Sequence, residues 1–160
     1  MLKNSNPDIQ AFFKEHQVAV LATASKNDSR PHAAAVFYES DSYLNLYFLT
    51  KERTIKSGNL DSNPFAAMVI YDASMLSTAQ VTGQVNRVND PDMMAKALRI
   101  MSRHSKEVSG SAETPVSKLD AGGYVLYRLT PTSIRLADYK YGGEQIFEVA
   151  VPAEEQLNNY

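Results

Sequence analysis

Short apolar runs follow one another along most of the chain, and several alternate between apolar and polar positions as β-strands do. Segments rich in Asn, Asp, Ser and Gly separate the runs and have the chemistry of turns. The pattern predicts about eight strands, at residues 18–24, 31–38, 43–50, 65–71, 78–88, 124–129, 133–139 and 145–151. Strands that are joined mainly by short turns favour an antiparallel sheet that closes, or nearly closes, into a barrel.

Three segments are expected to be helical. Residues 6–8 (Asn-Pro-Asp) form a helix start, and Ile9, Phe12 and Phe13 then lie on one face of a helix that covers one barrel end. A short helix is expected at 51–63, where Pro64 ends it. A longer helix begins at Asp90 and carries a stripe formed by Met94, Ala97, Leu98 and Met101. This spacing predicts that the methionines pack in a core rather than bind a metal or haem.

Two features of the pattern concern irregular structure. Gly83 interrupts the alternation of strand 78–88, which indicates a β-bulge or a close approach by backbone or ligand. Residues 105–123 are rich in Ser, Gly, Ala and Pro and are expected to form a long loop.

Composition narrows the class of protein. The 160 residues, 44% of them hydrophobic, fit one domain over 1–160. A net charge of -2 gives no general attraction to nucleic acid or to acidic membranes. Neither a signal peptide nor a run of roughly 18 apolar residues is present, so we expect no membrane span. With no cysteine, disulfides and thiolate chemistry are excluded, and a cytoplasmic location is expected.

Several catalytic and binding motifs are missing from the sequence. There is no G-x-G-x-x-G or G-x-x-x-x-G-K-[ST] motif for a dinucleotide or P-loop site, and no G-x-S-x-G elbow for a serine hydrolase. His16 and His104 are far apart and show no metal-ligand spacing. No metal site is therefore expected.

The segment 47–64, YFLTKERTIKSGNLDSNP, carries the most specific chemistry. An apolar strand runs into a helix start that bears Thr50, Lys51, Arg53, Thr54 and Lys56. Free N–H groups and partial positive charge at a helix N-terminus stabilise an anion, and these side chains can converge on a phosphate there. The alternative interpretation is a solvated helix start of mixed charge.

The same segment resembles part of the pyridoxamine 5'-phosphate oxidase-like family, the flavin-binding split β-barrels. The resemblance covers roughly residues 18–88, with weaker similarity over 124–139. The residues that fall at the family's spacing are Thr50, Thr54, Lys56, Leu60, Asn63 and Pro64. The implied fold is mainly β (α+β), an antiparallel split β-barrel with flanking helices.

The resemblance also implies a cofactor and a set of residues to bind it. In the family, a threonine closes a barrel strand, and a hydroxyl residue and a lysine on the next helix hold the FMN phosphate. The cofactor-binding residues expected in this chain are His32, Leu49, Thr50, Arg53, Thr54, Lys56 and Gln80. The chain departs from the family at Ile55, because in the family this position is often a second phosphate-binding arginine. Arg53 or Lys51 is expected to compensate for it.

Two of these residues lie outside the phosphate segment. His32 corresponds to a cationic residue that touches the flavin, and its imidazole could hydrogen-bond the polar edge of the ring. The alternative is a hydrogen-bonded histidine at a strand end. Gln80, or Thr78 in its place, is expected near the isoalloxazine, although either residue could equally face outward from the barrel.

The function that the resemblance implies is hydride or electron transfer through flavin N5, in a homodimer with FMN at the subunit interface. The substrate is a small molecule that the sequence does not identify, and no catalytic residue is named. Pyridoxamine 5'-phosphate oxidase itself carries C-terminal tryptophan and arginine motifs, whereas this chain has no tryptophan. It is closer to the small stress-protein-like members. The alternatives are a non-enzymatic flavin-binding or flavin-sensing module, or a barrel that binds deazaflavin or haem.

Overall fold

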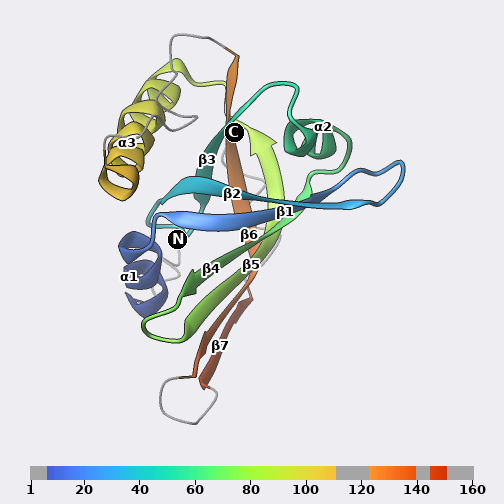
Figure 1. The fold of residues 1–160 in the computed structure, drawn as a ribbon. Coiled ribbons are helices and arrows are strands. Elements are labelled where there is room, and N and C mark those ends of the chain that lie inside the picture. Colours follow the sequence, from blue (N-terminus) through green and yellow to red (C-terminus); the bar gives the residue numbers. More distant parts are fainter. Residues whose placement is uncertain (1–6, 111–122, 140–144, 151–160) are drawn as a thin grey trace.

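A computed structural model describes residues 7–110, 123–139 and 145–150. These residues form three helices and seven strands (Figure 1). In chain order the elements are α1 (Pro7–Glu15), β1 (Val18–Ala24), β2 (Pro31–Ser40), β3 (Leu46–Lys51), α2 (Ile55–Ser62), β4 (Phe65–Asp72), β5 (Ser77–Arg87), α3 (Pro91–Ser109), β6 (Tyr124–Asp138) and β7 (Gln145–Ala150).

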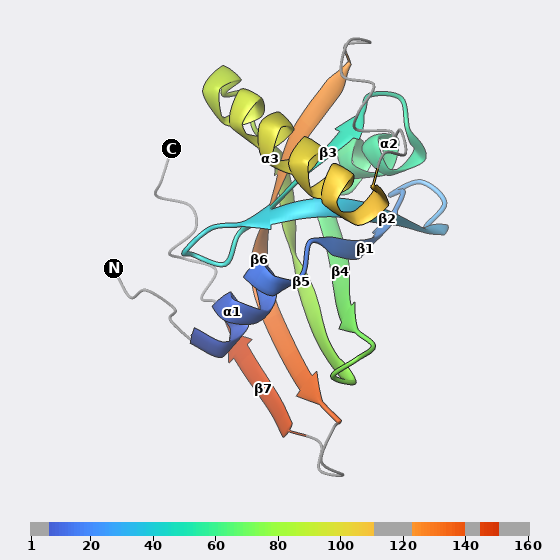
Figure 2. The same cartoon turned by 60° about the vertical axis from the view of Figure 1, so that its left-hand side comes forward.

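The strands form a closed antiparallel barrel. Their order is β3-β2-β1-β4-β5-β6-β7, and β3 pairs in addition with β6, from Leu46 opposite Leu129 to Lys51 opposite Tyr124. This last pairing closes six strands into a ring, and β7 extends from β6 outside it (Figure 2). The predicted split β-barrel with flanking helices is confirmed.

Alternate residues of the strands point into the barrel and form its core. In β1, Ala19 and Leu21 are buried, whereas Val18 and Val20 are 40% and 47% exposed. Burying one leucine side chain stabilises the fold by about 1.5–3 kcal/mol. A slip of one residue in the β1 register would turn Leu21 outward and lose that energy, so the alternation fixes the register.

The three helices occupy two different positions. Both α1 and α2 pack into the barrel core, α1 through Ile9, Phe12 and Phe13 and α2 through Leu60. α3 instead lies on the outside of the barrel, across β2 and β3 (Figure 2). There, Met101 is fully buried in a cluster with Leu49 and Leu126. The prediction that the stripe of this helix packs in a core is confirmed.

β6 is one continuous strand, where the sequence predicted two strands separated by Thr130 and Pro131. The physical reason lies in its partner strand. Pro131 faces Gly83 at a shift in the β5–β6 register, between Thr82 and Gly83. A β-bulge interrupts the ladder at this point, so a proline that cannot donate a hydrogen bond is tolerated within the strand.

The role of Gly83 is now clear. A Cβ atom at Gly83 would collide with the backbone carbonyl oxygen of Thr130. Gly83 therefore combines two of the predicted features: it lies at a β-bulge, and the backbone of β6 approaches it closely.

The start of β3 and the end of α3 are among the element ends that differ from the prediction. β3 begins at Leu46 rather than at 43, because the Asp41 carboxylate accepts from the N–H groups of Tyr43 and Asn45, both at 2.9 Å, and holds these residues in a turn. α3 continues to Ser109, through the first part of the loop predicted at 105–123. Residues 111–122 of that loop lie outside the described residues.

Candidate functional site

The junction between β3 and α2 is built around two threonine hydroxyls. Thr50 is buried near the end of β3, and its Oγ1 lies 3.2 Å from Oγ1 of Thr54. Thr54 has extended backbone angles (φ -84°, ψ 159°) and caps α2, since its Oγ1 accepts from the N–H of Ser57 at 3.3 Å. The Thr54 hydroxyl also donates to the carbonyl oxygen of Lys51 at 3.1 Å.

These contacts determine which donors remain for a ligand. Because Thr54 donates to Lys51, the hydroxyl of Thr50 is the donor in the contact between the two threonines. Helix geometry leaves the N–H groups of Ile55 and Lys56 without an acceptor in the preceding turn. The two N–H groups and the Lys56 ammonium are thus the donors that this junction presents. The threonines mainly hold the chain in the shape that presents them.

Lys56 is half-buried in the first turn of α2, and burial lowers the pKa of its ammonium group below the ordinary value. Among the described residues, no carboxylate lies within ion-pair distance of it, and α2 has no acidic residue in its first turn. A partly desolvated cation without a counterion, beside free N–H groups, is an environment that an anion stabilises.

The neighbouring cations occupy different positions from those predicted. The helix begins at Ile55 rather than at 51, because Lys51 still pairs with Tyr124 as the last residue of β3. The Lys51 ammonium lies over the ring of Tyr124, 5.8 Å from its centroid. Arg53 was expected in the first helical turn. It lies instead in the turn before the helix, where it is exposed and has φ +62°.

Leu49 faces the opposite side of β3 from Thr50. Its side chain is buried beneath α3, in the cluster with Ala97 and Met101. The side chain therefore packs the barrel against α3 and does not share the face of β3 that carries Thr50.

His32 lies on the inward face of β2, opposite Thr23 of β1. The Thr23 hydroxyl accepts from the side-chain amide of Asn59 at 3.1 Å, so His32 is at the end of the barrel that α2 covers. Its Nδ1 is buried and has no hydrogen-bond partner in the part of the chain that the structure describes. A buried ring nitrogen without a partner is compatible with a ligand contact.

Gln80 is exposed on the outer face of the barrel, between Val69 of β4 and Arg135 of β6. Along β5 it precedes Arg87 by seven residues, or roughly 23 Å of extended strand. The structure thus brings Thr50, Thr54 and Lys56 together, with His32 at the same barrel end, and places Gln80 on a different surface. Thr78, the alternative to Gln80, has a buried hydroxyl oxygen without a partner among the described residues.

The sequence analysis missed a group of residues that hold α2 in place. Arg87, at the end of β5, forms an ion pair with Asp61 of α2 and approaches Glu52 in the preceding turn. Tyr127 of β6 shares a hydrogen bond of 2.9 Å with Ser57. These partners are far apart in the sequence, and no local pattern marks them.

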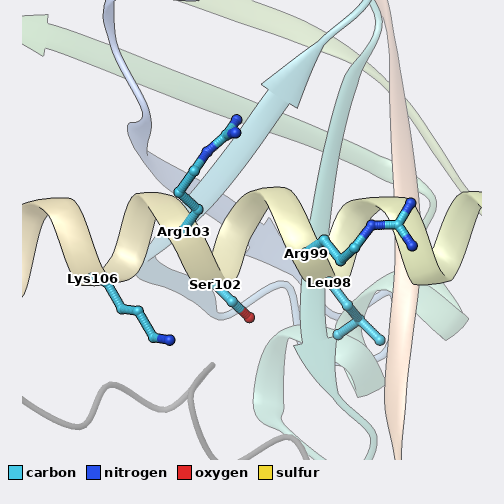
Figure 3. Close-up of a pocket in the computed structure, with 5 residues that line it drawn as sticks. All are labelled: Leu98, Arg99, Ser102, Arg103 and Lys106. Atoms are coloured by element: carbon cyan, nitrogen blue, oxygen red, sulfur yellow. The ribbon is translucent and has the colours of Figure 1, made fainter.

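A hollow of about 420 Å³ lies on a different element, α3, and is lined by Leu98, Arg99, Ser102, Arg103 and Lys106. Figure 3 shows Arg103 and Lys106 extending to opposite sides of the helix. Its cations do not converge on one point as those of an anion site would, and we assign it no ligand.

The chain was compared with protein families. Residues 5–138 match the family model described as pyridoxamine 5'-phosphate oxidase. The chain belongs to the pyridoxamine 5'-phosphate oxidase family. This confirms the family that the residues of the β3–α2 segment indicated. The comparison with curated proteins finds no match.

Solved structures of similar fold are distant in sequence. A pyridoxamine 5'-phosphate oxidase-related, FMN binding protein from Nostoc punctiforme is 14% identical, covers 96% of this chain and 94% of its own, and has a TM-score of 0.70. General Stress Protein 26 from Bacillus anthracis is 16% identical over 91% of this chain and 97% of its own, with a TM-score of 0.64. A conserved hypothetical protein from Mycobacterium tuberculosis is 21% identical over 94% of each chain, with a TM-score of 0.65. At these identities the likeness shows the fold.

The helices were also compared with the length of a membrane span. Among the described residues, none of them combines the length and the apolar character that crossing a bilayer requires.

Proposed function

We propose that this member of the pyridoxamine 5'-phosphate oxidase family binds FMN, with the phosphate at the start of α2. The observation that carries the proposal is Lys56, a half-buried ammonium group with a lowered pKa and no carboxylate partner in the described structure. The free N–H groups of Ile55 and Lys56 complete the site. The family match and the FMN-binding relative from Nostoc punctiforme support the same cofactor.

The residues at the junction have separable roles in this proposal. Lys56 contributes charge, Thr54 holds the first helical turn, and Thr50 orients Thr54 from the strand. Arg53 is exposed in the adjacent turn, where its guanidinium can approach the outer side of a phosphate. The unpartnered Nδ1 of His32 is the candidate contact to the ring system.

The chemistry that we propose is that of a flavin-dependent oxidoreductase acting on a small molecule. FMN, when bound, supplies hydride or electron transfer, and the chain binds and orients it. We do not propose pyridoxamine 5'-phosphate oxidase activity, because the chain has no tryptophan. We propose the cytoplasm as its location, where a chain without cysteine is unaffected by the reducing conditions.

A second copy of the chain is the proposed partner, and the outer surface of the barrel supports it. α3 covers one apolar region of that surface, around Tyr47 and Leu49. Over β1 and β4 the valines Val20 and Val69 are register partners, and 47% and 41% of these side chains are exposed. Exposed apolar patches of this kind mark interaction sites.

The same surface continues into small residues. Ala22 of β1 lies between Ala33 of β2 and Ala67 of β4 in the register. The outward positions of residues 20–24 of β1, 31–35 of β2 and 67–69 of β4 carry no charged side chain, so two copies can face one another there without repulsion. Gln80 is the next residue in the row of Val69, so in such a dimer it would reach the flavin of the partner copy rather than that of its own chain.

Fluorescence titration with FMN and riboflavin tests the cofactor proposal. Lys56→Met should weaken FMN binding roughly 10- to 150-fold, since a hydrogen bond to a charged group contributes about 1.5–3 kcal/mol. Riboflavin, which lacks the phosphate, should bind both proteins alike. Lys96→Met is the matched control, because Lys96 is exposed on α3. Equal FMN affinity of the parent and Lys56→Met would refute the phosphate site.

The enzymatic part is tested by the visible spectrum of the purified protein and by turnover with NADH or NADPH. Repeated reduction of an added acceptor supports an oxidoreductase. Flavin that binds but does not turn over would favour the flavin-binding or flavin-sensing module instead.

The dimer is tested by sedimentation of Val20→Glu, which should be monomeric. Met93→Glu is its control, because Met93 is an exposed apolar residue of α3, outside the proposed interface. A parent protein that stays monomeric while it binds FMN one-to-one would refute the dimer and leave the phosphate site intact.

A further inference from the structure

Arg87 joins the two segments that flank the proposed phosphate site. Its Nε and Nη2 donate to Oδ1 of Asp61 on α2 at 3.1 and 2.9 Å, and Nη2 also donates to Oδ2 at 2.9 Å. Its Nη1 lies 3.6 Å from Oε1 of Glu52, in the turn between β3 and α2. One guanidinium group at the end of β5 therefore contacts residues on both sides of Thr54 and Lys56.

A buried hydrogen bond fixes the other side of α2. The Tyr127 hydroxyl and Ser57 Oγ are 2.9 Å apart, and both residues are 2% exposed. The Tyr127 ring is stacked on Phe48 of the barrel core, with 5.4 Å between the ring centroids. Arg87 lies over the same tyrosine ring, 5.8 Å from its centroid. One aromatic ring and the arginine that covers it thus add to the core packing of Leu60 in holding α2 in place.

The charge of Arg87 has a second consequence for an anion at this site. Glu52 precedes the capping residue Thr54 by two positions, so the turn that leads into the proposed phosphate site carries a carboxylate. An unpaired carboxylate there would repel the phosphate and compete with it for Lys56. In the structure both Glu52 and Asp61 are instead directed to Arg87.

We propose that Arg87 is a positioning residue for phosphate binding. It orients the turn at 52–54 and the start of α2, and it keeps the Glu52 carboxylate away from the anion, without contacting the phosphate. This role rests on the proposed FMN site. Ion pairs as exposed as these contribute little to stability. Loss of Arg87 should therefore affect phosphate binding more than it affects folding.

The test compares FMN with riboflavin in four variants. Arg87→Met should weaken FMN binding three- to tenfold and change riboflavin binding less than twofold. Arg87→Lys retains the charge but not the forked contact with Asp61, so it should restore part of the loss. Glu52→Gln in the Arg87→Met background should also restore part of it, because no carboxylate is then released. Arg103→Met removes an exposed arginine of α3 that pairs with Glu107 rather than with the residues around α2, and this variant should bind both ligands as the parent does.

The outcomes separate this role from the site itself. A parent protein that binds FMN and riboflavin equally overturns the phosphate site, and the role of Arg87 with it. A parent that prefers FMN, together with an Arg87→Met variant of unchanged preference, overturns the role of Arg87 alone. Equal weakening of both ligands would show that Arg87 only supports the fold. If Arg87→Met does not fold, Arg87→Lys tests the role of Arg87 in its place. An Arg87→Lys variant that prefers FMN over riboflavin as strongly as the parent does would show that the forked contact with Asp61 is not required, and would overturn the positioning role.

Discussion

Replacing Ile55 by arginine should strengthen FMN binding. Ile55 is the first residue of α2, next to Lys56, and 64% of its side chain is exposed. The family resemblance implies a phosphate-binding arginine at this position. Because the isoleucine is so exposed, its removal costs little packing, and an arginine can be accommodated without rearranging the core.

The size of the gain follows from two opposing contributions. A new hydrogen bond from a guanidinium to the phosphate contributes about 1.5–3 kcal/mol. Ordering the arginine side chain costs up to about 2 kcal/mol. With about 2 kcal/mol gained and about 1 kcal/mol lost, the net gain is about 1 kcal/mol, which corresponds to roughly fivefold tighter binding. A cation at a helix N-terminus is unfavourable by about 0.3–1 kcal/mol, so the free variant should be slightly less stable than the parent.

Two measurements make this prediction specific. Fluorescence titrations of Ile55→Arg and Ile55→Gln should show a gain for arginine only, since glutamine adds polarity without charge. The gain should be absent for riboflavin and should decrease as the salt concentration is raised. A gain that riboflavin shares, or one that glutamine reproduces, would mean that position 55 does not face the phosphate.

Three further predictions concern stability and pH. Gly83→Ala should lower the free energy of unfolding by about 1–3 kcal/mol, because the added methyl group meets the Thr130 carbonyl. Gly58→Ala should instead raise the free energy of unfolding by about 0.5–1 kcal/mol, because Gly58 lies in mid-helix with open space around it. Equal effects of the two substitutions in denaturant titrations would contradict the bulge. Hydrogen bonds from Ser74 and then His16 lower the pKa of Asp72 to about 2. Its stabilisation is therefore complete above the ordinary value near 4 and is lost as the pH falls through 2, so the difference in Tm between the parent and Asp72→Asn should shrink over that window. Because burial lowers the pKa of Lys56 in the free protein and a phosphate would raise it, FMN affinity should fall as the pH rises through the alkaline range, and a Lys56→Arg variant should show a flatter profile.

The sequence predicted the local features of the fold well, because each rests on residues that are close together in the chain. The bounds of β1 follow from its apolar run and the turn residues after it, and the buried stripe of α3 from its helical spacing. The prediction was wrong at residues 130–132, where Pro131 was expected to divide a strand. What decides that region is the bulge at Gly83, on another strand. A pattern in one segment carries no information about the irregularity of its partner.

The same distinction applies to the candidate site. Thr50, Thr54 and Lys56 lie within seven consecutive positions, so their convergence could be predicted from the sequence. The contact between Arg87 and Asp61 spans 26 positions and depends on how β5 ends beside α2. His32 and Gln80 both lie on strands, and only the register of those strands shows that they face opposite sides of the barrel wall.

The charges of α2 are placed opposite to those that stabilise a helix. Helices are stabilised by acids in the first turn and bases in the last turn. α2 has neither of these, and it carries the reverse arrangement, with Lys56 at its start and Asp61 near its end. Each reversed charge costs about 0.3–1 kcal/mol at an exposed site. Arg87 offsets the cost at Asp61, whereas within the described structure nothing offsets it at Lys56. A phosphate at the start of α2 would complete this arrangement, which is why FMN binding should stabilise α2 in particular.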